Sequence, residues 1–394
     1  MKTPELYYRV LQTDGDVLKK LTNYYDGIVI EAHILEHYTN FTTSLVSAIK
    51  KPFFIDPTHK LALFNLECIA EKEWVIKIME VYKISEYLQE KEIDLELLRE
   101  HLNTFVKATI KYQRARLSES SGGLKLFGIV PESQELKPQI ILAPYFLIDG
   151  INTESYKLNL EIIEKAIPLK DKDKLYAVLA LEGHLLSKDP SKIISDFAKE
   201  GVDGFCVWIS DFREYDEDPK MLKKYVEFFE ELSKVGKPVI NLYGGAFSVF
   251  IGKLGFIDCI VQGIGYGEYR NPFVHATGGY PKRYYIPKIH RFVPIHLAQE
   301  LLAAVPELKC ECDFCLEANI LETQEEMINA SSLKKHYVLS RWREKQTDFN
   351  DLYRNLTNTI QLLDEHGVLD KYWYHLRHLK NWCEVLESFS SERP

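Results

Sequence analysis

The sequence lacks the features that mark membrane, secreted and nucleotide-triphosphate-binding proteins. No apolar run in the 394 residues approaches the ~18–20 residues that a membrane-spanning helix needs. The opening residues, MKTPELYYRV, contain no apolar signal core, so we expect a cytoplasmic protein with no membrane partner. The glycines of GIGYGEYR lack the Lys-Ser/Thr ending of a phosphate-binding loop, which argues against binding of a nucleoside triphosphate.

Basic residues and cysteines are also in short supply. Lys and Arg number 49 against 58 Asp and Glu, a net charge of −9 that excludes a uniformly basic coat protein but not a local basic patch. The cysteines number seven, too few and odd in count for a disulfide framework. Hydrophobic residues make up 46% of the chain, which is enough to bury a large core.

What the sequence does contain is an alternation of short apolar runs with longer amphipathic stretches. The runs are nearly all apolar, as strands covered on both faces are. We predict eight strands, at residues 27–34, 52–56, 139–146, 175–181, 204–209, 238–243, 258–262 and 283–289. Eight strands separated by helices predict an α/β fold, a (β/α)8 TIM-like barrel. The alternative is a doubly wound sheet, but no G-x-G-x-x-G follows the first predicted strand.

Three of the cysteines lie within six residues, as C-x-C-x2-C. They are Cys310, Cys312 and Cys315, and His336 follows in the segment LKKHYVLSRWREK. Three thiolates and one imidazole complete a tetrahedral shell around Zn2+, and four protein ligands leave no open position for a substrate. We therefore predict a structural zinc site, with His290 and His296 as alternatives to His336.

These features divide the chain into three parts. The barrel is expected at 1–305, with a helical insertion at about 66–120 between the second and third strands. The polar stretch SESSGG at 118–123 is expected to form a turn after that insertion. A zinc-binding subdomain is expected at 306–345, and C-terminal helices at 346–394.

Several segments together resemble the tRNA-guanine transglycosylases. LKCECDFC…LKKHYVLSRWREKQ is similar to the zinc subdomain of that family, and KPVINLYGGAFSVFIGKLGFIDC resembles the segment that ends in its Asp-Cys pair. KPFFIDPTHKLALF resembles the segment around the family's D-S-G-G-F motif. The resemblance implies a catalytic nucleophile at Asp258 and a second catalytic carboxylate at Asp56. Asp258 stands at the start of its predicted strand, however, whereas barrel enzymes carry their catalytic residues at the carboxyl ends of the strands.

The chain departs from the family where the base and the nucleic acid would bind. IVQGIGYGEYR stands in place of L-P-T-R-N-A-R-N-G, and the family's paired glycines correspond roughly to Trp208 and Ile209. After Asp56 the D-S-G-G-F residues are replaced by Pro57, Thr58, His59 and Lys60. A retained scaffold with an altered pocket resembles a divergent branch, such as the enzymes that insert 7-deazaguanine bases into DNA.

The resemblance implies a pentosyltransferase that exchanges guanine in a nucleic acid for a 7-deazaguanine base such as preQ0. Double displacement needs one carboxylate that attacks the anomeric carbon and a second acidic group that moves protons. The polymer is DNA or tRNA, with DNA favoured, and a homodimer or a partner protein is compatible with the sequence. The main alternative is a non-catalytic, nucleic-acid-binding partner subunit of a transglycosylase complex. A zinc-stabilised barrel hydrolase would need an open metal site, which the His-poor strand ends do not offer.

Polar residues near other strand ends are candidate substrate-binding residues. Glu182, Asp211 and Glu268 could accept hydrogen bonds from a purine, and Tyr145 could stack on one. Basic residues near the zinc motif, with aromatic residues between them, are candidate contacts to phosphates, although a solvated helix face would have the same composition. These residues are Lys334, Lys335, Arg341, Arg343, Arg283 and Lys288.

Overall fold

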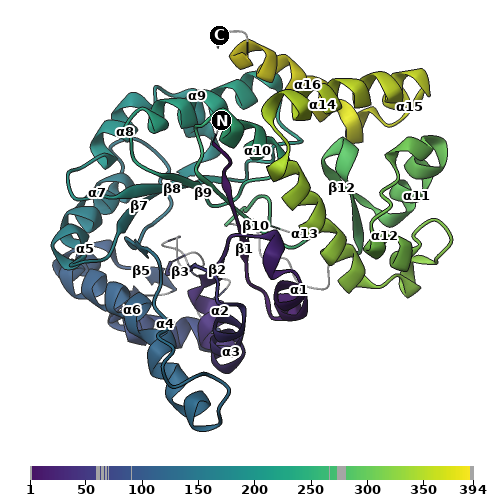
Figure 1. Cartoon of the computed structure of the whole chain (residues 1–394). Coiled ribbons are helices and arrows are strands. Elements are labelled where there is room, and N and C mark those ends of the chain that lie inside the picture. The colour runs from purple at the N-terminus through teal and green to yellow at the C-terminus, as the bar shows by residue number, and fades with distance from the viewer. Residues whose placement is uncertain are drawn as a thin grey trace.

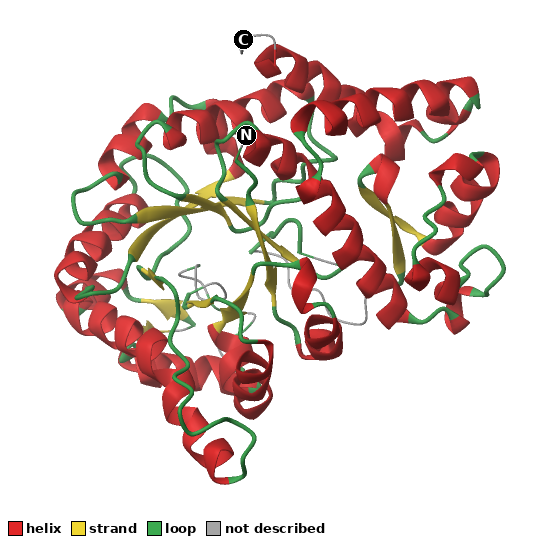
Figure 2. Cartoon of the chain, viewed as in Figure 1, coloured by secondary structure: helices red, strands yellow, loops and turns green. Residues whose placement is uncertain are grey.

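The computed structural model describes residues 2–58, 63, 66, 69, 71–89, 91–265, 267–272 and 281–390. At its centre eight parallel strands form a nearly closed barrel with helices around it (Figure 1 and Figure 2). In order around the barrel they are β3 (Phe53–Asp56), β2 (Gly27–Glu31), β1 (Glu5–Arg9), β10 (Cys259–Gly263), β9 (Val239–Asn241), β8 (Gly204–Ser210), β7 (Leu175–Glu182) and β6 (Ile141–Leu142). The N–H of Gln139, just before β6, donates to the carbonyl of Phe53 at 2.8 Å and closes the ring. The predicted TIM-like barrel is confirmed.

One barrel strand is not the one that the apolar pattern predicted. β1 lies between β2 and β10, with Arg9 opposite Val29 on one side and Gly263 on the other. The predicted strand at 283–289 instead forms β11 (Arg283–Ile286), which pairs antiparallel with β12 (Arg291–Pro294) outside the barrel. The sequence of β1, ELYYR, has charged residues at both ends, so its apolar run is too short to identify a buried strand by pattern alone.

Most helices between the barrel strands lie on the outside of the ring (Figure 2). They are α1 (Gly15–Lys20), α2 (Ala32–His37), α3 (Thr39–Ile49), α7 (Glu154–Ala166), α8 (Ser191–Phe197), α9 (Pro219–Ser233) and α10 (Ala246–Lys253). Among the described helices of the chain, none is both long and apolar enough to cross a membrane.

The helical insertion between β3 and β6 is longer than the sequence suggested. It contains α4 (Glu73–Tyr82), the short strands β4 (Leu88–Gln89) and β5 (Glu92–Ile93), α5 (Leu95–Glu100) and α6 (Leu102–Leu126). The predicted turn SESSGG is wrong, because it lies inside α6. Contacts with the rest of the fold override the weak helix propensity there: the hydroxyl of Ser120 lies 2.8 Å from that of Thr43 on α3.

The C-terminal third of the chain packs beside the barrel rather than around it (Figure 1). It contains the β11–β12 hairpin, α11 (Ile295–Ala304), α12 (Asp313–Ala318) and α13 (Ala330–Gln346). The last helices are α14 (Phe349–Glu365), α15 (Val368–Lys371) and α16 (Trp373–Ser390). The hairpin packs against the cysteine motif and His336: the hydroxyl of Tyr284 lies 3.1 Å from the sulfur of Cys315, and its ring stacks on His336 with centroids 4.8 Å apart.

Glycines make room for aromatic rings inside the barrel. A Cβ atom on Gly204 of β8 would lie 2.4 Å from the ring of Tyr176 on β7, and Gly27 of β2 has the same relation to Tyr7 of β1. Both rings belong to the buried cluster that fills the barrel. The interior is therefore a packed core, and chemistry is confined to its ends.

We expect Gly204→Ala to lower the free energy of unfolding by about 1–3 kcal/mol, because the added methyl group must displace a buried ring. The matched control is Gly122→Ala in α6, where nothing lies within 4 Å of the new Cβ. The control should stabilise the protein by up to about 1 kcal/mol through helix propensity. Chemical denaturation of the two variants measures both effects, and equal stability would contradict this packing.

Candidate active site and metal centre

Three charged residues meet at the carboxyl ends of three neighbouring strands. Arg9, Glu31 and Asp56 are the last residues of β1, β2 and β3, and Glu31 and Asp56 are register partners. Nη1 of Arg9 lies 2.9 Å from Oε1 of Glu31 and 3.2 Å from Oδ2 of Asp56. Two carboxylates therefore share one guanidinium at the end of the barrel where (β/α)8 enzymes carry their chemistry. This cluster is the candidate active site.

Asp56 is the most deeply buried member of the cluster. Its residue exposure is 0%, and the hydroxyl of Tyr145 donates to its Oδ1 at 2.8 Å. Burial raises the pKa of Asp56 above its usual range, and the nearby charge of Arg9 opposes that rise only in part. Tyr145 is itself buried and bound to Asp56, so the stacking role predicted for it is wrong in this arrangement.

Glu31 is the more accessible carboxylate. Its side chain keeps 10% of its exposure, against 0% for Asp56, and its Oε2 lies 3.2 Å from Nδ1 of His33. Sequence reasoning missed Glu31 because it fell inside the predicted strand at 27–34, and missed Arg9 because β1 was not predicted. Glu31 is an acidic residue within an otherwise apolar run, and this could have identified it as a site residue at the end of β2.

Asp258 does not join this cluster. It precedes Cys259, which opens β10 and pairs with Glu5 at the start of β1. Because the strands are parallel, Asp258 and Asp56 lie at opposite ends of the barrel, so they cannot act together as the two catalytic carboxylates that the resemblance implied. The Asp258 carboxylate instead accepts the N–H of Val239 at 2.8 Å and pairs with Lys2, so it ties the start of β9 to the N-terminal segment.

Two of the predicted substrate-binding residues do lie at the same end as Asp56. Glu182 ends β7, and its carboxylate lies 3.2 Å from Nδ1 of His184. Asp211 follows β8 with φ +55°, and its N–H donates to the carbonyl of Arg270 at 2.8 Å. A non-glycine residue in the left-handed region stores strain of a kind that clusters at functional sites. Both carboxylates remain partly exposed.

Glu268 belongs to the loop that follows β10, and its side chain is buried. Only 6% of the residue is exposed, and the hydroxyl of Tyr337 on α13 donates to its Oε1 at 3.0 Å. Burial raises the pKa of Glu268 to about 7, although the charge of Arg341 opposes the shift. Glu268 therefore joins the barrel to α13 and does not face a base.

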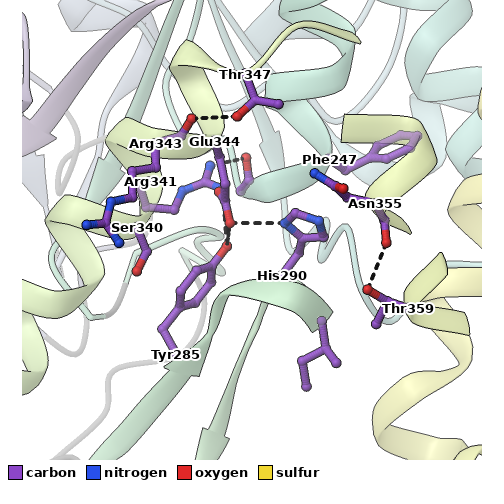
Figure 3. Close-up of polar contacts among 12 residues, drawn as sticks. Phe247, Tyr285, His290, Ser340, Arg341, Arg343, Glu344, Thr347, Asn355 and Thr359 are labelled. Atoms are coloured by element: carbon purple, nitrogen blue, oxygen red, sulfur yellow. Dashed lines mark hydrogen bonds and ion pairs between the residues drawn. The ribbon is translucent and has the colours of Figure 1, made fainter. Parts of the chain in front are cut away.

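Arg341 cannot contact a nucleic acid, because it is fully buried. Its guanidinium donates to the carbonyl of Gly245 at 2.7 Å and to Oε1 of Gln262 at 3.2 Å. It also pairs with Glu344 (Figure 3). The predicted phosphate contact is wrong, since this side chain anchors α13 to the barrel. Among the other basic candidates, Lys334 is held by Asp14 at 2.7 Å. Those that remain at least partly at the surface are Lys335, Arg343, Arg283 and Lys288.

The four predicted metal ligands come together as the sequence indicated. The ligand atoms of Cys310, Cys312, Cys315 and His336 all lie within 4.8 Å of one another. Nδ1 of His336 lies 3.5 Å from the sulfur of Cys312 and 3.1 Å from that of Cys315. These separations approach the ~3.8 Å edge of a tetrahedron with ~2.3 Å metal–sulfur bonds. The group could therefore hold a metal ion.

The second nitrogen of His336 supports that assignment. Nε2 lies 2.7 Å from the carbonyl of Tyr285, which fixes the tautomer that leaves Nδ1 free to bind a metal. The alternative ligands are placed elsewhere. His290 faces Glu344 at 3.0 Å, and His296 is exposed on α11.

The raised pKa of Glu268 gives stability a defined pH dependence. The folded protein retains a proton that the unfolded chain releases above its ordinary pKa of 4.5. The stability contribution is therefore complete below pH 4.5 and is lost as the pH rises to about 7. Relative to Glu268→Gln, which cannot ionise, the wild type should lose roughly 1.4 kcal/mol per pH unit across this window. Denaturation of both proteins across the window measures the difference, and parallel profiles would contradict a buried, protonated Glu268.

Comparison with known proteins leaves the family of this chain open. No protein-family model matches it, and a search of curated proteins found no match. Two solved structures show a weak likeness. One is a mutant protein in complex with xylotriose, 12% identical, with a TM-score of 0.39 over 67% of this chain and 86% of that chain. The other is xylanase B from Clostridium stercorarium F9, 10% identical, with a TM-score of 0.35 over 68% of this chain and 86% of that chain. Scores this low carry no argument about function.

Proposed function

We propose that this protein is a guanine transglycosylase that exchanges guanine in a nucleic acid for a 7-deazaguanine base, with Glu31 as the nucleophile. The observation that carries the proposal is the pair of carboxylates, Glu31 and Asp56, held by Arg9 at the carboxyl end of the barrel. The resemblance to the transglycosylases supplies the substrate class. We assign the role of nucleophile to Glu31 instead of Asp258, because Glu31 lies beside Asp56.

The exchange proceeds by two displacements at one carbon. A carboxylate oxygen of Glu31 forms a bond to the anomeric carbon while the bond from that carbon to guanine breaks, and the electron pair leaves with the base. The departing base takes up one proton. In the second displacement the incoming base loses one proton, bonds to the same carbon and releases the carboxylate. The nucleic-acid strand stays intact throughout.

The neighbours of Glu31 suit these roles. Arg9 orients the carboxylate, and its own position is set by hydrogen bonds to the carbonyl of Leu242 at 3.0 Å and by contact with the ring of Tyr243 at 4.1 Å. Asp56, whose pKa is raised by burial, is the proton reservoir of the pair. Glu182 and Asp211 stand at the same end of the barrel and could accept hydrogen bonds from the base.

The polymer in this proposal is DNA in preference to tRNA, and the incoming base is one such as preQ0. That preference rests on the departures from the tRNA enzymes in the pocket segments. Trp208 stands roughly where the family's sequence has paired glycines, and its ring lies 5.6 Å from that of Tyr243 and 6.4 Å from that of Tyr145.

A second candidate function is a non-catalytic partner subunit of a transglycosylase complex that binds nucleic acid. The aromatic packing around Trp208 favours it, as do the complete burial of Asp56 and the position of Asp258 at the far end of the barrel. The two candidates differ in whether the chain alone incorporates a labelled base.

For the metal centre we propose Zn2+ in a structural role. Three thiolates and one imidazole are its usual closed shell. Purified protein should contain about one zinc per chain, and Cys312→Ser should release it and unfold α12 and the hairpin while the barrel stays folded. Elemental analysis together with limited proteolysis measures both. Cys206→Ser, inside the barrel and away from the cluster, is the matched control and should retain the metal. Metal-free protein with a protease-resistant C-terminal third would contradict the proposal.

Base exchange should depend on Glu31 and not on Asp258. Glu31→Gln keeps the size of the side chain but cannot form the glycosyl ester, so incorporation of labelled guanine into DNA or tRNA should fall by a factor of roughly a thousand or more. Asp258→Asn should retain most activity after correction for stability, because Asp258 lies at the opposite end of the barrel.

The comparison has three informative results. Loss in Glu31→Gln alone supports the proposed mechanism. Loss in Asp258→Asn alone, with a normal fold, would contradict it. Absence of exchange in the wild type on both polymers, with nucleic-acid binding retained, would favour the partner-subunit function.

A further inference from the structure

A cavity of about 570 Å3 lies beside the metal cluster, away from the strand ends that carry Glu31 and Asp56. Its walls come from the segment around Pro287, the segment that leads into the cysteine motif, and the helices α13 and α14. Figure 3 shows part of the wall, with His290, Ser340, Arg343 and Glu344 on one side and Asn355 and Thr359 of α14 on the other. The volume is in the range of pockets that hold small organic ligands.

Three basic side chains from three separate segments line this cavity. They are Lys288, Lys309 and Arg343, all of them exposed, and none makes an ion pair within the part of the chain that the structure describes. In a chain of net charge −9, unpaired cations that converge on one cavity are a distinctive feature.

The acidic residues of the cavity offset these cations only in part. Glu344 is already neutralised by Arg341, and it also accepts the hydroxyl of Tyr285 at 2.7 Å and faces His290 at 3.0 Å. Glu311 is the other acid of the lining. Cys310 of the metal cluster lines the same cavity as Arg343, so the two lysines are the cations assigned to a ligand.

The rest of the lining indicates more than a simple anion. Leu308, Leu352 and Leu362 supply an apolar surface, and Asn355 and Asn358 supply amide donors and acceptors. A bare phosphate would use only the cations and a small part of the volume. A nucleoside phosphate would use all three features, since it adds a planar apolar base with hydrogen-bonding edges.

We propose that this cavity binds a nucleotide, with Lys288 and Lys309 on its phosphate and the leucines and asparagines on its base. The phosphate ester can belong to a free nucleotide or to a strand of nucleic acid. This proposal rests on the proposed function, because a strand bound here would give the enzyme a second binding site for its nucleic-acid substrate. The binding itself does not require base exchange.

The test compares Lys288→Glu/Lys309→Glu with the control Lys107→Glu/Lys165→Glu. The control lysines are exposed and lie on α6 and α7, far around the barrel, and both doubles change the net charge equally. Fluorescence anisotropy with a labelled single-stranded oligodeoxynucleotide should show roughly tenfold weaker binding for the cavity variant. The slope of its salt dependence should fall by about 0.7 for each phosphate that a lysine no longer neutralises. The control should bind within about twofold of wild type. Equal binding by the two doubles would overturn the proposal.

Competition identifies the ligand. Displacement of the oligonucleotide by guanosine 5′-monophosphate would support the site with a free nucleotide as its source. If the monophosphate does not displace the oligonucleotide, but the cavity variant still binds the oligonucleotide more weakly than the control does, the site binds a nucleic-acid strand. Inorganic phosphate that competes as well as the nucleotide would overturn the nucleotide assignment. The binding assay involves no base exchange, and exchange is measured separately on the cavity variant and its control, so failure of this site and failure of the exchange chemistry are separate results.

Discussion

The direction of the strands is the constraint on which the account of this protein depends. In a parallel barrel every strand begins at one end and finishes at the other, so two side chains can cooperate only if they occupy the same end of their strands. Glu31 and Asp56 both end their strands and share Arg9, whereas Asp258 precedes its strand. Asp258 could act together with Asp56 only if its strand ran in the opposite direction.

A second, fully buried arginine joins the barrel to the metal-binding part of the chain. Arg341 reaches from α13 to the carbonyl of Gly245 and to Gln262 of β10, and its charge is balanced by Glu344. Beside it, Glu268 from the loop after β10 is held by Tyr337 of the same helix. Loss of one member would leave an unpaired buried charge, which costs far more than the pair contributes. The metal cluster, α13 and the mouth of the barrel therefore hold their relative positions together.

Much of the architecture could be predicted from the sequence because it rests on short-range patterns. Seven of the barrel strands are buried apolar runs. The C-x-C-x2-C spacing marked the metal cluster, which His336 joins from α13. β1 was not predicted because ELYYR is short and has charged ends. Without β1, Arg9 could not be recognised as a residue at a strand end. Burial of Arg341 was equally hidden, since a run of basic residues looks the same whether one member points inward or outward. Glu31 and Asp56 lie on different strands, so their proximity could be predicted only from the register of those strands, which the sequence does not reveal.

The most direct test of this account is to map a trapped covalent intermediate. Wild-type protein would be incubated with DNA or tRNA in the presence of guanine, denatured, digested with protease and nuclease, and analysed by peptide mass spectrometry. The account predicts a nucleotide remnant on the peptide that contains Glu31, and none on the peptide that contains Asp258. A remnant on Asp258, or no adduct with either polymer, would contradict it.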